Sequence, residues 1–395
     1  MARNPRPIAP LLGFFEKDMA SYPQSHYSKT KVNAAGEILR GTIPWSPGMS
    51  SDEITQVFNI AHDWRNAHVY PMRRIRQELA GRIKRIQASA ITAARVKRMK
   101  SIRRKLQRLP MNLTQIQDLG GCRAILASVS EMEALVDTYR SSPSNHLIRN
   151  DTNYIQQPRP GGYRSHHFVL EFQGDEDQKI HDGKRIEVQI RTQLQHSWAT
   201  AVEAIGLVRG EDLKGGEGDE SWLRLFELMS SEFAEIEKCP LVPGTPDRPI
   251  RRDEIGQLNE KLNAAKTLEN LAHAFRYIED FIRGDAKYFL IQYDRAKEEV
   301  RVRGYAGSID GTNQASRAEE SSGSTDSVLV EIDQIANLKE AYPNYFGDVG
   351  NFVSHVNAVV HGSTTGGTPS ETIMDAKKRA GYDVSFLNTP WRDRR

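Results

Sequence analysis

The stretch Arg185–Thr192, RIEVQIRT, decides the fold. Ile186, Val188 and Ile190 alternate with polar residues, so the apolar side chains of an extended strand would share one face and be buried. The opposite face would carry Glu187, Gln189 and Arg191. An acid, an amide and a cation in one row suit a solvated surface and a catalytic set equally well.

Segments around this strand change repeatedly between helical and extended patterns, which predicts an α+β fold. Helical spacing is found from Ser50 onward and at 72–88, 99–108, 130–140 and 193–205. Strands are expected at 89–97, 122–127 and 167–173. The segment 141–163 has the composition of a long polar loop.

The pattern beyond residue 208 predicts further regions that are separate from the main domain. Helices are expected at 221–238, 253–284, 333–341 and 348–361, with a hairpin at 288–303 and a short strand at 328–331. The stretch 306–327 is poor in apolar residues. We therefore expect an N-terminal extension (1–49), a main domain (50–208), a helical region (221–285), a small α+β module (286–362) and a C-terminal tail (363–395).

Composition narrows the class of protein. Of the 395 residues, 38% are hydrophobic and 8% aromatic, which is ordinary for a globular protein. No run of about 20 apolar residues is present, so no membrane span is expected. The N-terminus lacks the order of a secretion signal. Cys122 and Cys239 make no disulfide framework or zinc site, and this cysteine usage is typical of the cytoplasm.

Positive charge is concentrated in one part of the chain. The net charge is only +3, but Arg73–Arg108 contains 14 Lys or Arg and a single acid, Glu78. Such a run is often just a solvated helix face. Its length also favours a surface that binds an anion, either a polyphosphate or an RNA backbone.

The pattern Arg95-x-Lys97-x3-Ser101-x3-Lys105 lies where a strand is expected to turn into a helix. Arg95 and Lys97 would share one face of the strand, and Ser101 and Lys105 one face of the helix. Three cations and a hydroxyl directed at one point, near a helix N-terminus, suit a triphosphate. A generic basic helix explains the pattern equally well.

Two further segments carry polar groups beside glycines. In Asp118-Leu-Gly-Gly-Cys-Arg123 a ligand could approach the backbone closely, so Asp118 could hold Mg²⁺ and Arg123 a phosphate. In the loop before 167–173, Tyr163 offers a flat face for a base and Arg159 a positive charge. His167 is expected to face the cleft, with its neighbour on the other side of the strand.

Taken together, these segments resemble the synthetase domain of the RelA/SpoT family, a nucleotidyltransferase-like fold that makes the alarmones ppGpp and pppGpp. The family pattern runs R-x-K-x3-S-x3-K, D-x-x-G-x-R, N-G-Y-x-S-x-H and E-x-Q-I-R-T followed by a histidine, here His196. All four motifs occur in this order. The resemblance covers roughly 50–206, with a weaker echo at 341–346.

The resemblance implies a fold and an activity. The fold would be a mixed sheet flanked by helices, and 50–208 would transfer pyrophosphate from ATP to the 3′-hydroxyl of GDP or GTP. Mg²⁺ would be bound by Asp118 and Glu187, and Glu187 would also help to deprotonate the hydroxyl. The ATP phosphates would be held by Arg95, Lys97, Ser101, Lys105 and Arg123. The acceptor would be bound by Arg159, Tyr163, His167, Gln189, Arg191 and His196.

Two departures from the family pattern lie on the acceptor side. Gly161 stands where the family has Asn, and Asn153 stands at a position that is acidic in the family. The acceptor therefore stays open between GDP, GTP, an adenosine nucleotide and the 3′ end of tRNA, the last as the target of a toxin. A catalytically silent nucleotide or RNA sensor is a further alternative.

The remaining sequence is less informative. His62-Asp63 lacks the separate His and Asp of a metal-dependent phosphohydrolase, so no hydrolase half is expected. Residues 221–395 could regulate the enzyme, form oligomers, or neutralise a toxic catalytic domain by covering its cleft. The sequence does not choose among these roles.

Overall fold

The protein is described by a computed structural model. The structure describes residues 22–41, 48–142, 144–274, 276–280, 285–294, 296–321, 325–333, 336–345 and 349–362. The expected C-terminal tail and much of the expected N-terminal extension lie outside these residues. None of the described helices is long and apolar enough to cross a bilayer.

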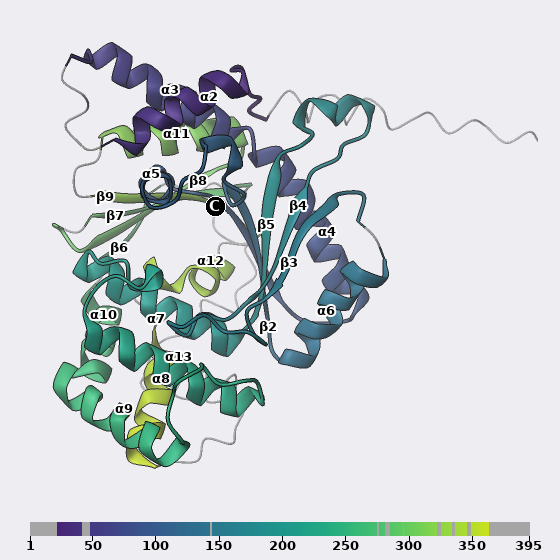
Figure 1. Cartoon of the computed structure of the whole chain (residues 1–395). Coiled ribbons are helices and arrows are strands. Elements are labelled where there is room, and N and C mark those ends of the chain that lie inside the picture. Colours follow the sequence, from purple (N-terminus) through teal and green to yellow (C-terminus); the bar gives the residue numbers. More distant parts are fainter. Residues whose placement is uncertain are drawn as a thin grey trace, which may run out of the picture.

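A single mixed sheet of nine strands organises the described chain (Figure 1). Its order is β3-β4-β5-β2-β1-β9-β7-β8-β6. The pairs β2/β5 and β6/β8 are parallel, and the other neighbours are antiparallel. The strands are β1 (Ile91–Val96), β2 (Gly120–Leu126), β3 (Leu147–Asn153), β4 (His166–Glu171), β5 (Arg185–Thr192), β6 (Arg276–Asp280), β7 (Tyr288–Asp294), β8 (Glu299–Tyr305) and β9 (Thr325–Glu331). The predicted α+β class and mixed sheet are confirmed.

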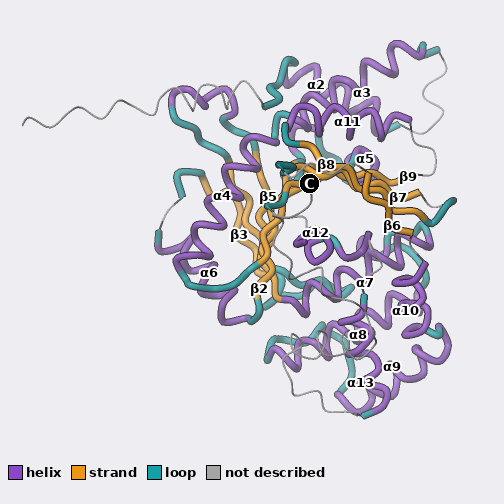
Figure 2. Tube along the Cα trace, turned by 180° about the vertical axis from the view of Figure 1, so that it is seen from behind, coloured by secondary structure: helices purple, strands orange, loops and turns teal. Residues whose placement is uncertain are grey.

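Helices lie on both faces of this sheet and in a group at one end (Figure 2). The helices are α2 (Lys29–Arg40), α3 (Ser51–Asn66), α4 (Val69–Arg85), α5 (Met99–Arg108), α6 (Val129–Ser141), α7 (Gln193–Arg209), α8 (Glu220–Glu237), α9 (Arg248–Leu262), α10 (Ala264–Ala274), α11 (Ser308–Ser321), α12 (Ala336–Ala341) and α13 (Gly350–His361). Short 3₁₀ turns are η1 (Leu113–Gln115), η2 (Glu176–His181), η3 (Leu213–Gly215) and η4 (Pro343–Tyr345). A second apolar core joins α7 to α8, α9, α10 and α13.

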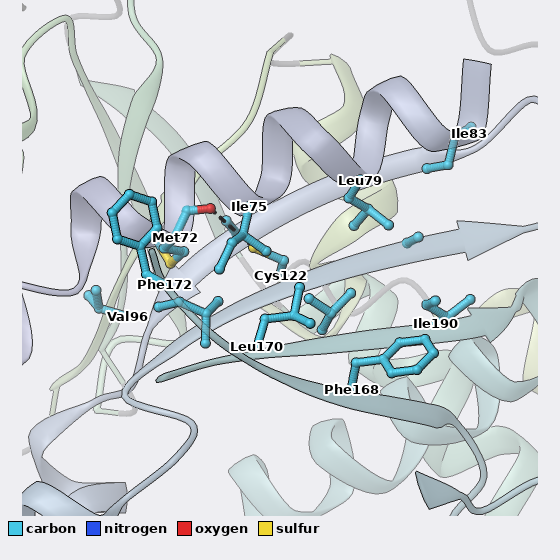
Figure 3. Packing of buried hydrophobic residues seen from close by; sticks show 14 of the residues in the cluster. Met72, Ile75, Leu79, Ile83, Val96, Cys122, Phe168, Leu170, Phe172 and Ile190 are labelled. Atoms are coloured by element: carbon cyan, nitrogen blue, oxygen red, sulfur yellow. Dashed lines mark hydrogen bonds between the residues drawn. The ribbon is translucent and has the colours of Figure 1, made fainter. Parts of the chain in front are cut away.

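The predicted apolar face of β5 packs against α4 and α6. Ile186, Val188 and Ile190 are fully buried in one core with α4 side chains such as Ile75 and Leu79 (Figure 3). Burying a side chain of this size contributes roughly 1.5–3 kcal/mol. Since side chains alternate along a strand, this packing turns the polar row of β5 to the opposite face, where α7 lies.

The two halves of the sheet meet at a short junction. Strand β1 pairs with β9 at only two positions, Ala94↔Glu331 and Arg95↔Val330, whereas β2 pairs with β5 at seven. The hairpin β7–β8 and strand β9 therefore continue the sheet of the main domain. Helix α11 packs on the same side as α4, and η4 packs on the other. The domain boundaries expected from the sequence stay predictions.

Four segments differ from the expectation. Strand β3 lies in the expected loop 141–163, because an exposed edge strand needs no apolar alternation. The expected helix 253–284 stops at Asn263, whose φ of 47° ends α9, and after α10 the chain enters β6. Helix α2 lies within the N-terminal extension, for which no element was expected.

Helix α11 lies in the apolar-poor stretch 306–327. It packs through small residues. A Cβ on Gly311 would lie 3.3 Å from side-chain atoms of Leu329 and Tyr288. Ala315 is buried in the same core. Small residues leave no periodic apolar signal in the sequence, so the helix could not be predicted from hydrophobic spacing.

Candidate active site

A cavity of about 360 Å³ opens on the α7 face of the sheet, beside the ends of β1, β2 and β5. It is lined by strand residues, by α5 and α7, by the segment 210–215, and by η4 of the C-terminal half. Eleven of the thirteen residues predicted for the site line this cavity. They are Arg95, Lys97, Ser101, Lys105, Asp118, Arg123, Arg159, Tyr163, His167, Glu187 and Gln189.

The predicted turn from strand to helix creates the cationic wall. Strand β1 ends at Val96 and α5 begins at Met99, with Arg98 in an extended conformation between them. Lys97 and Lys105 both reach Asp118, which precedes β2: Lys97 Nζ lies 2.6 Å from Oδ2, and Lys105 Nζ 2.9 Å from Oδ1. The two lysines of the pattern thus meet at Asp118, and Arg95 and Ser101 line the same cavity.

Asp118 is held in its charged form. Burial would raise the pKa of this carboxyl, but the charges and hydrogen bonds of Lys97 and Lys105 outweigh that effect and hold the pKa well below its usual range. Both carboxylate oxygens are occupied by ammonium groups. A divalent cation or the phosphates of a ligand would exchange partners with these lysines.

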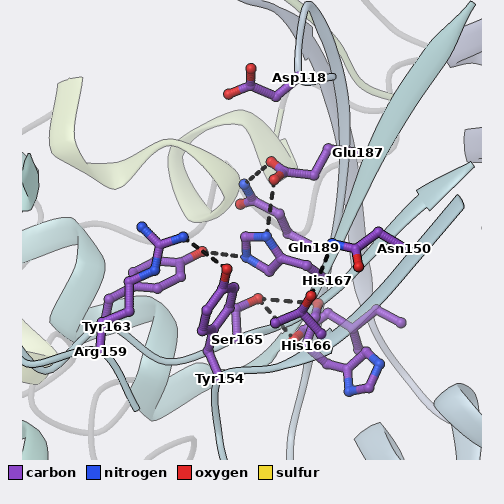
Figure 4. A network of polar contacts seen from close by, with 12 residues as sticks. Asp118, Asn150, Tyr154, Arg159, Tyr163, Ser165, His166, His167, Glu187 and Gln189 are labelled. Carbon is purple, nitrogen blue, oxygen red and sulfur yellow. Dashed lines mark hydrogen bonds and ion pairs between the residues drawn. The ribbon is translucent and has the colours of Figure 1, made fainter. Parts of the chain in front are cut away.

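Glu187 is oriented by two neighbours on the same face of the sheet (Figure 4). His167 Nδ1 lies 3.0 Å from Oε1, and Gln189 Nε2 donates to Oε2 at 2.6 Å. Burial opposes the charge of Glu187, but the hydrogen bond and charge of His167 outweigh it, so the pKa of Glu187 is lowered. The nearby charge of Asp118 acts in the opposite direction, because the two carboxylates repel each other.

Tyr163 lines the side of the cavity that was predicted to bind the acceptor. Its hydroxyl lies 2.7 Å from His167 Nε2, so Tyr163, His167 and Glu187 form one chain of polar contacts (Figure 4). Tyr163 is only 6% exposed, and burial raises its pKa to about 12. Arg159 donates to the hydroxyl of Tyr154 at 2.9 Å, and its guanidinium lies 5.7 Å from the Tyr163 ring centroid.

Arg191 and His196, the two remaining predicted residues, lie outside the cavity lining. Within the described part of the chain, Nε and Nη1 of Arg191 have no hydrogen-bond partner. Burial and the charge of Arg123 lower the pKa of Arg191 to about 9. His196 Nε2 lies 2.9 Å from the carbonyl of Glu340. Their proposed contact with the acceptor stays a prediction.

The two adjacent histidines of β4 point to opposite faces, as expected. His167 faces Glu187, whereas His166 Nε2 lies 2.7 Å from Asp151 on the other side of the sheet. Arg164, in the same loop as Arg159 and Tyr163, is buried. It donates to Ser230 and to the carbonyl of Ile155, so it fixes the loop against α8.

Several lining residues were not singled out from the sequence. Glu203 of α7 and Lys214 of η3 form an ion pair of 2.6 Å in the cavity wall. The C-terminal half contributes Asp326, Tyr342, Asn344 and Tyr345. Only the echo at 341–346 gave a sequence signal for the last three, and Phe346 lies outside the described residues.

The C-terminal half also contacts predicted site residues directly. Arg123 Nη1 donates to the carbonyl of Ala341 at 3.0 Å. Asp326 lies 3.4 Å from Arg98 and 3.8 Å from Lys100. The Ala341 carbonyl and the Asp326 carboxylate therefore contact cationic side chains of the wall that was predicted to bind the phosphates of ATP.

The fold and the site define an α+β protein in which two carboxylates line a cavity rich in cationic side chains. Comparison with known proteins finds that residues 94–206 match the model of a region found in RelA and SpoT proteins. That match contains all four motifs from Arg95 to Glu187 and confirms the resemblance seen in the sequence.

Relatives of known name match parts of the chain. The Bacillus subtilis GTP pyrophosphokinase YwaC is 31% identical over 115 residues, which are 28% of this chain and 54% of that protein. The Escherichia coli K12 GTP pyrophosphokinase is 24% identical over 189 residues, 46% of this chain and 24% of that protein. The chain thus spans about half of the first relative and a quarter of the second.

Solved structures match at low similarity. The B. subtilis small alarmone synthetase 1 bound to its product pppGpp is 18% identical, with a TM-score of 0.36. The match covers 47% of this chain and 94% of that one. A GTP pyrophosphokinase family protein from Streptococcus pneumoniae gives a TM-score of 0.37 at 20% identity, covering 56% and 98%.

Proposed function

We propose that the chain is a nucleotide pyrophosphokinase, which transfers pyrophosphate from ATP to the 3′-hydroxyl of a guanosine nucleotide to give ppGpp or pppGpp. The observation that carries this proposal is the meeting of Asp118, Glu187 and the cations of β1 and α5 in one cavity. The family of residues 94–206 and the names of the relatives agree with it.

The donor would lie along the cationic wall. Transfer of a phosphoryl-type group needs alignment and charge stabilisation more than covalent help from the protein. Arg95, Lys97 and Lys105 supply positive charge, and Ser101 supplies a hydroxyl at the start of α5. Lys97 and Lys105 would exchange Asp118 for phosphate oxygens when ATP binds, and the Asp118 carboxylate would then be available to hold a cation.

The two carboxylates fit a magnesium ion. Both are oxygen donors, and Mg²⁺ is commonly held by one or two carboxylates together with substrate phosphates and water. Their mutual repulsion is a further sign that a cation between them would be stabilised. No cluster of three or more His, Cys, Asp or Glu side chains suited to a metal occurs in the described chain, so phosphate and water would complete the coordination. The bound ion would neutralise charge that develops on the transferred group.

Glu187 is placed to receive the acceptor. Its lowered pKa keeps the carboxylate ionised at neutral pH, and His167 and Gln189 fix its orientation. An ionised, oriented carboxylate accepts a hydrogen bond from the attacking 3′-hydroxyl and aligns it with the donor. Tyr163 would contact the acceptor base from the opposite side of the cavity.

The test supplies γ-labelled ATP with GDP, GTP, AMP, ADP and deacylated tRNA in parallel, with Mg²⁺ or with a chelator. We expect label on GDP and GTP only when Mg²⁺ is present. Asp118→Asn should remove this transfer, and Asp177→Asn, on the surface turn η2, should not. Absence of label on every guanosine product would contradict the proposal.

A second candidate acceptor is the 3′ end of tRNA. The basic run 73–108 motivates it, and the structure divides that run in two. Arg76 and Arg82 are buried in ion pairs with acids of this chain. Lys84, Arg85 and Arg108 are exposed and could contact an RNA backbone. Label on tRNA with none on free nucleotides would select this acceptor.

A further inference from the structure

The segment between α7 and α8 is an ordered turn, although its glycines and acids suggest a connector. We call residues 210–218 the strap. Leu213 is buried in the core of α7 and α8. The side chain of Asp212 accepts a hydrogen bond from the backbone of Gly215, and Gly216 and Gly218 take φ values of 84° and 146°, which favour glycine.

The strap is fixed to both sides of the cavity. On the donor side, Asp212 Oδ2 lies 3.1 Å from Arg104 of α5. On the acceptor side, Lys214 Nζ lies 2.6 Å from Glu203 Oε1 of α7. Gly206 allows this approach, because a Cβ there would lie 2.9 Å from the carbonyl oxygen of Glu211. The chain therefore holds Lys214 at a defined place in the cavity.

Lys214 is held over the ring of Tyr163. Lys214 Nζ lies 5.3 Å from the ring centroid, and both Glu203 and Lys214 line the cavity. A base that contacts Tyr163 would therefore meet a carboxylate and an ammonium group side by side. Neither residue belongs to the four motifs, and neither has a part in the transfer described above.

We propose that Glu203 and Lys214 recognise the edge of the acceptor base, which makes them specificity-determining residues; this inference rests on the proposed function. The pair offers one hydrogen-bond acceptor beside one donor. A purine edge is complementary, since guanine carries O6 beside N–H groups and adenine carries the N6 amino group beside a ring nitrogen.

The charges of Glu203 and Lys214 would then have partners both in the free protein and in its complex with the nucleotide. Without a nucleotide, Glu203 and Lys214 satisfy each other, so no buried charge is left alone. With a nucleotide, each exchanges its partner for an atom of the base. A base that lacks one of these groups leaves a charged side chain unpaired in the cavity, and such sites discriminate strongly.

The experiment measures KM and kcat for two pairs of acceptors. GDP and IDP differ only in the 2-amino group of guanine, and ADP and purine riboside diphosphate differ only in the 6-amino group of adenine. The variants are Glu203→Gln, Lys214→Met and Lys214→Arg. Glu217→Gln, at an exposed position of the strap, is the matched control.

We expect the wild-type enzyme to prefer the amino-bearing member of one pair. In Glu203→Gln that preference should fall by about 10-fold, whereas the KM for ATP should change less than about 2-fold. Lys214→Met should raise the KM of the preferred acceptor, Lys214→Arg should restore part of it, and Glu217→Gln should behave as wild type. The preferred pair identifies guanine or adenine as the base.

Two results would overturn the inference. One is an unchanged amino-group preference in a folded Glu203→Gln protein. The other is a KM for ATP that changes as much as the acceptor KM, which would show a structural role for the ion pair. If the wild type transfers nothing to any acceptor, the proposed function fails separately. Calorimetric binding of GDP against IDP and of ADP against purine riboside diphosphate, to wild type and Glu203→Gln, then decides whether the pair still recognises a base.

Discussion

The two halves of the sheet face the same cavity but contribute opposite charges. The half formed by β1 to β5 carries the cations between Arg95 and Lys105, which form the proposed donor wall, together with Asp118 and Glu187. The half formed by β6 to β9 brings mainly acids to the junction. Glu331 and Asp333 pair with Arg76, and Asp326 pairs with Arg98.

This difference shows how a two-residue strand junction is stabilised. Strands β1 and β9 share only two backbone pairs, so side chains provide much of the contact between the halves. Glu319 of α11 accepts from the backbone N–H of Met99, the first residue of α5, and pairs with Arg65. Anions are favoured at a helix N-terminus. The C-terminal half thus binds the same helix that begins the predicted ATP site.

The largest expected effect is a loss of activity without a loss of stability, at a residue away from this junction. Glu187→Gln should lower kcat by at least about 10³-fold, because it removes the charge that is proposed to align the acceptor and would help to hold the cation. Thermal stability should change little, since the amide keeps the shape of the side chain. Steady-state transfer assays measure the loss, with Glu176→Gln, on the exposed turn η2, as the control. Retained activity in Glu187→Gln would show that the carboxylate has no part in the reaction.

A large effect on stability is expected at the junction itself. Arg76→Met leaves Glu331, which is 2% exposed, without its main partner. Breaking a buried pair from one side costs about 3–5 kcal/mol in the free energy of unfolding. Glu331→Gln should cost much less, because Arg76 keeps both of its contacts to Asp333, at 2.8 and 2.9 Å. Urea unfolding of both variants measures the difference.

The pH dependence of that pair follows from the position of Glu331. Burial raises the pKa of Glu331 even with Arg76 present. Without Arg76 the folded state would take up a proton at a pH where the unfolded state does not, so lowering the pH stabilises the folded variant. The deficit of Arg76→Met should therefore shrink between pH 7 and pH 5. A deficit that does not depend on pH would show that Glu331 is not its cause.

The first half of the site could be predicted because its chemistry depends on local spacing. Arg95 and Lys97 share a strand face, Ser101 and Lys105 a helix face, and Glu187 and Gln189 alternate with buried residues. Each relation follows from a backbone period. Backbone periods do not show which distant segments meet. The order of the four motifs resembled a known family, and that resemblance predicted that the segments form one site.

The second half could not be predicted in the same way. Asp326 and Glu319 look like surface acids in the sequence, and only their approach to Arg98 and to the start of α5 gives them a role. Lys214 lies among glycines that predict a connector, although Leu213 anchors the turn in the core. Such contacts depend on tertiary packing between segments far apart in sequence.

A smaller effect is expected where an acid of the second half meets the donor wall. Asp326→Asn weakens its contacts with Arg98 and Lys100, which are 26% and 58% exposed. Asp326 itself is only 8% exposed, but its partners reach solvent, and pairs of solvent-exposed charges contribute roughly 0.2–1 kcal/mol. Removing the negative charge of Asp326 from beside these cations should lower the KM for ATP by about 2- to 5-fold, more at low salt than at high salt. An unchanged or raised KM for ATP would indicate that Asp326 does not compete with phosphate for these groups.

The smallest expected effect is the interaction energy between a residue on the predicted acceptor side and a residue of the half formed by β6 to β9. Tyr163→Phe removes only the hydroxyl that contacts His167, so kcat should fall about 2- to 5-fold, as expected for the loss of one hydrogen bond. This chain of contacts ends at Glu187 and includes no residue of the second half. The effects of Tyr163→Phe and Asp326→Asn should therefore add, within about 0.5 kcal/mol, in a double-mutant cycle on kcat/KM. A larger interaction energy would show that the C-terminal half acts on the acceptor side as well as on the donor wall, and the contrast between the two halves would then no longer hold.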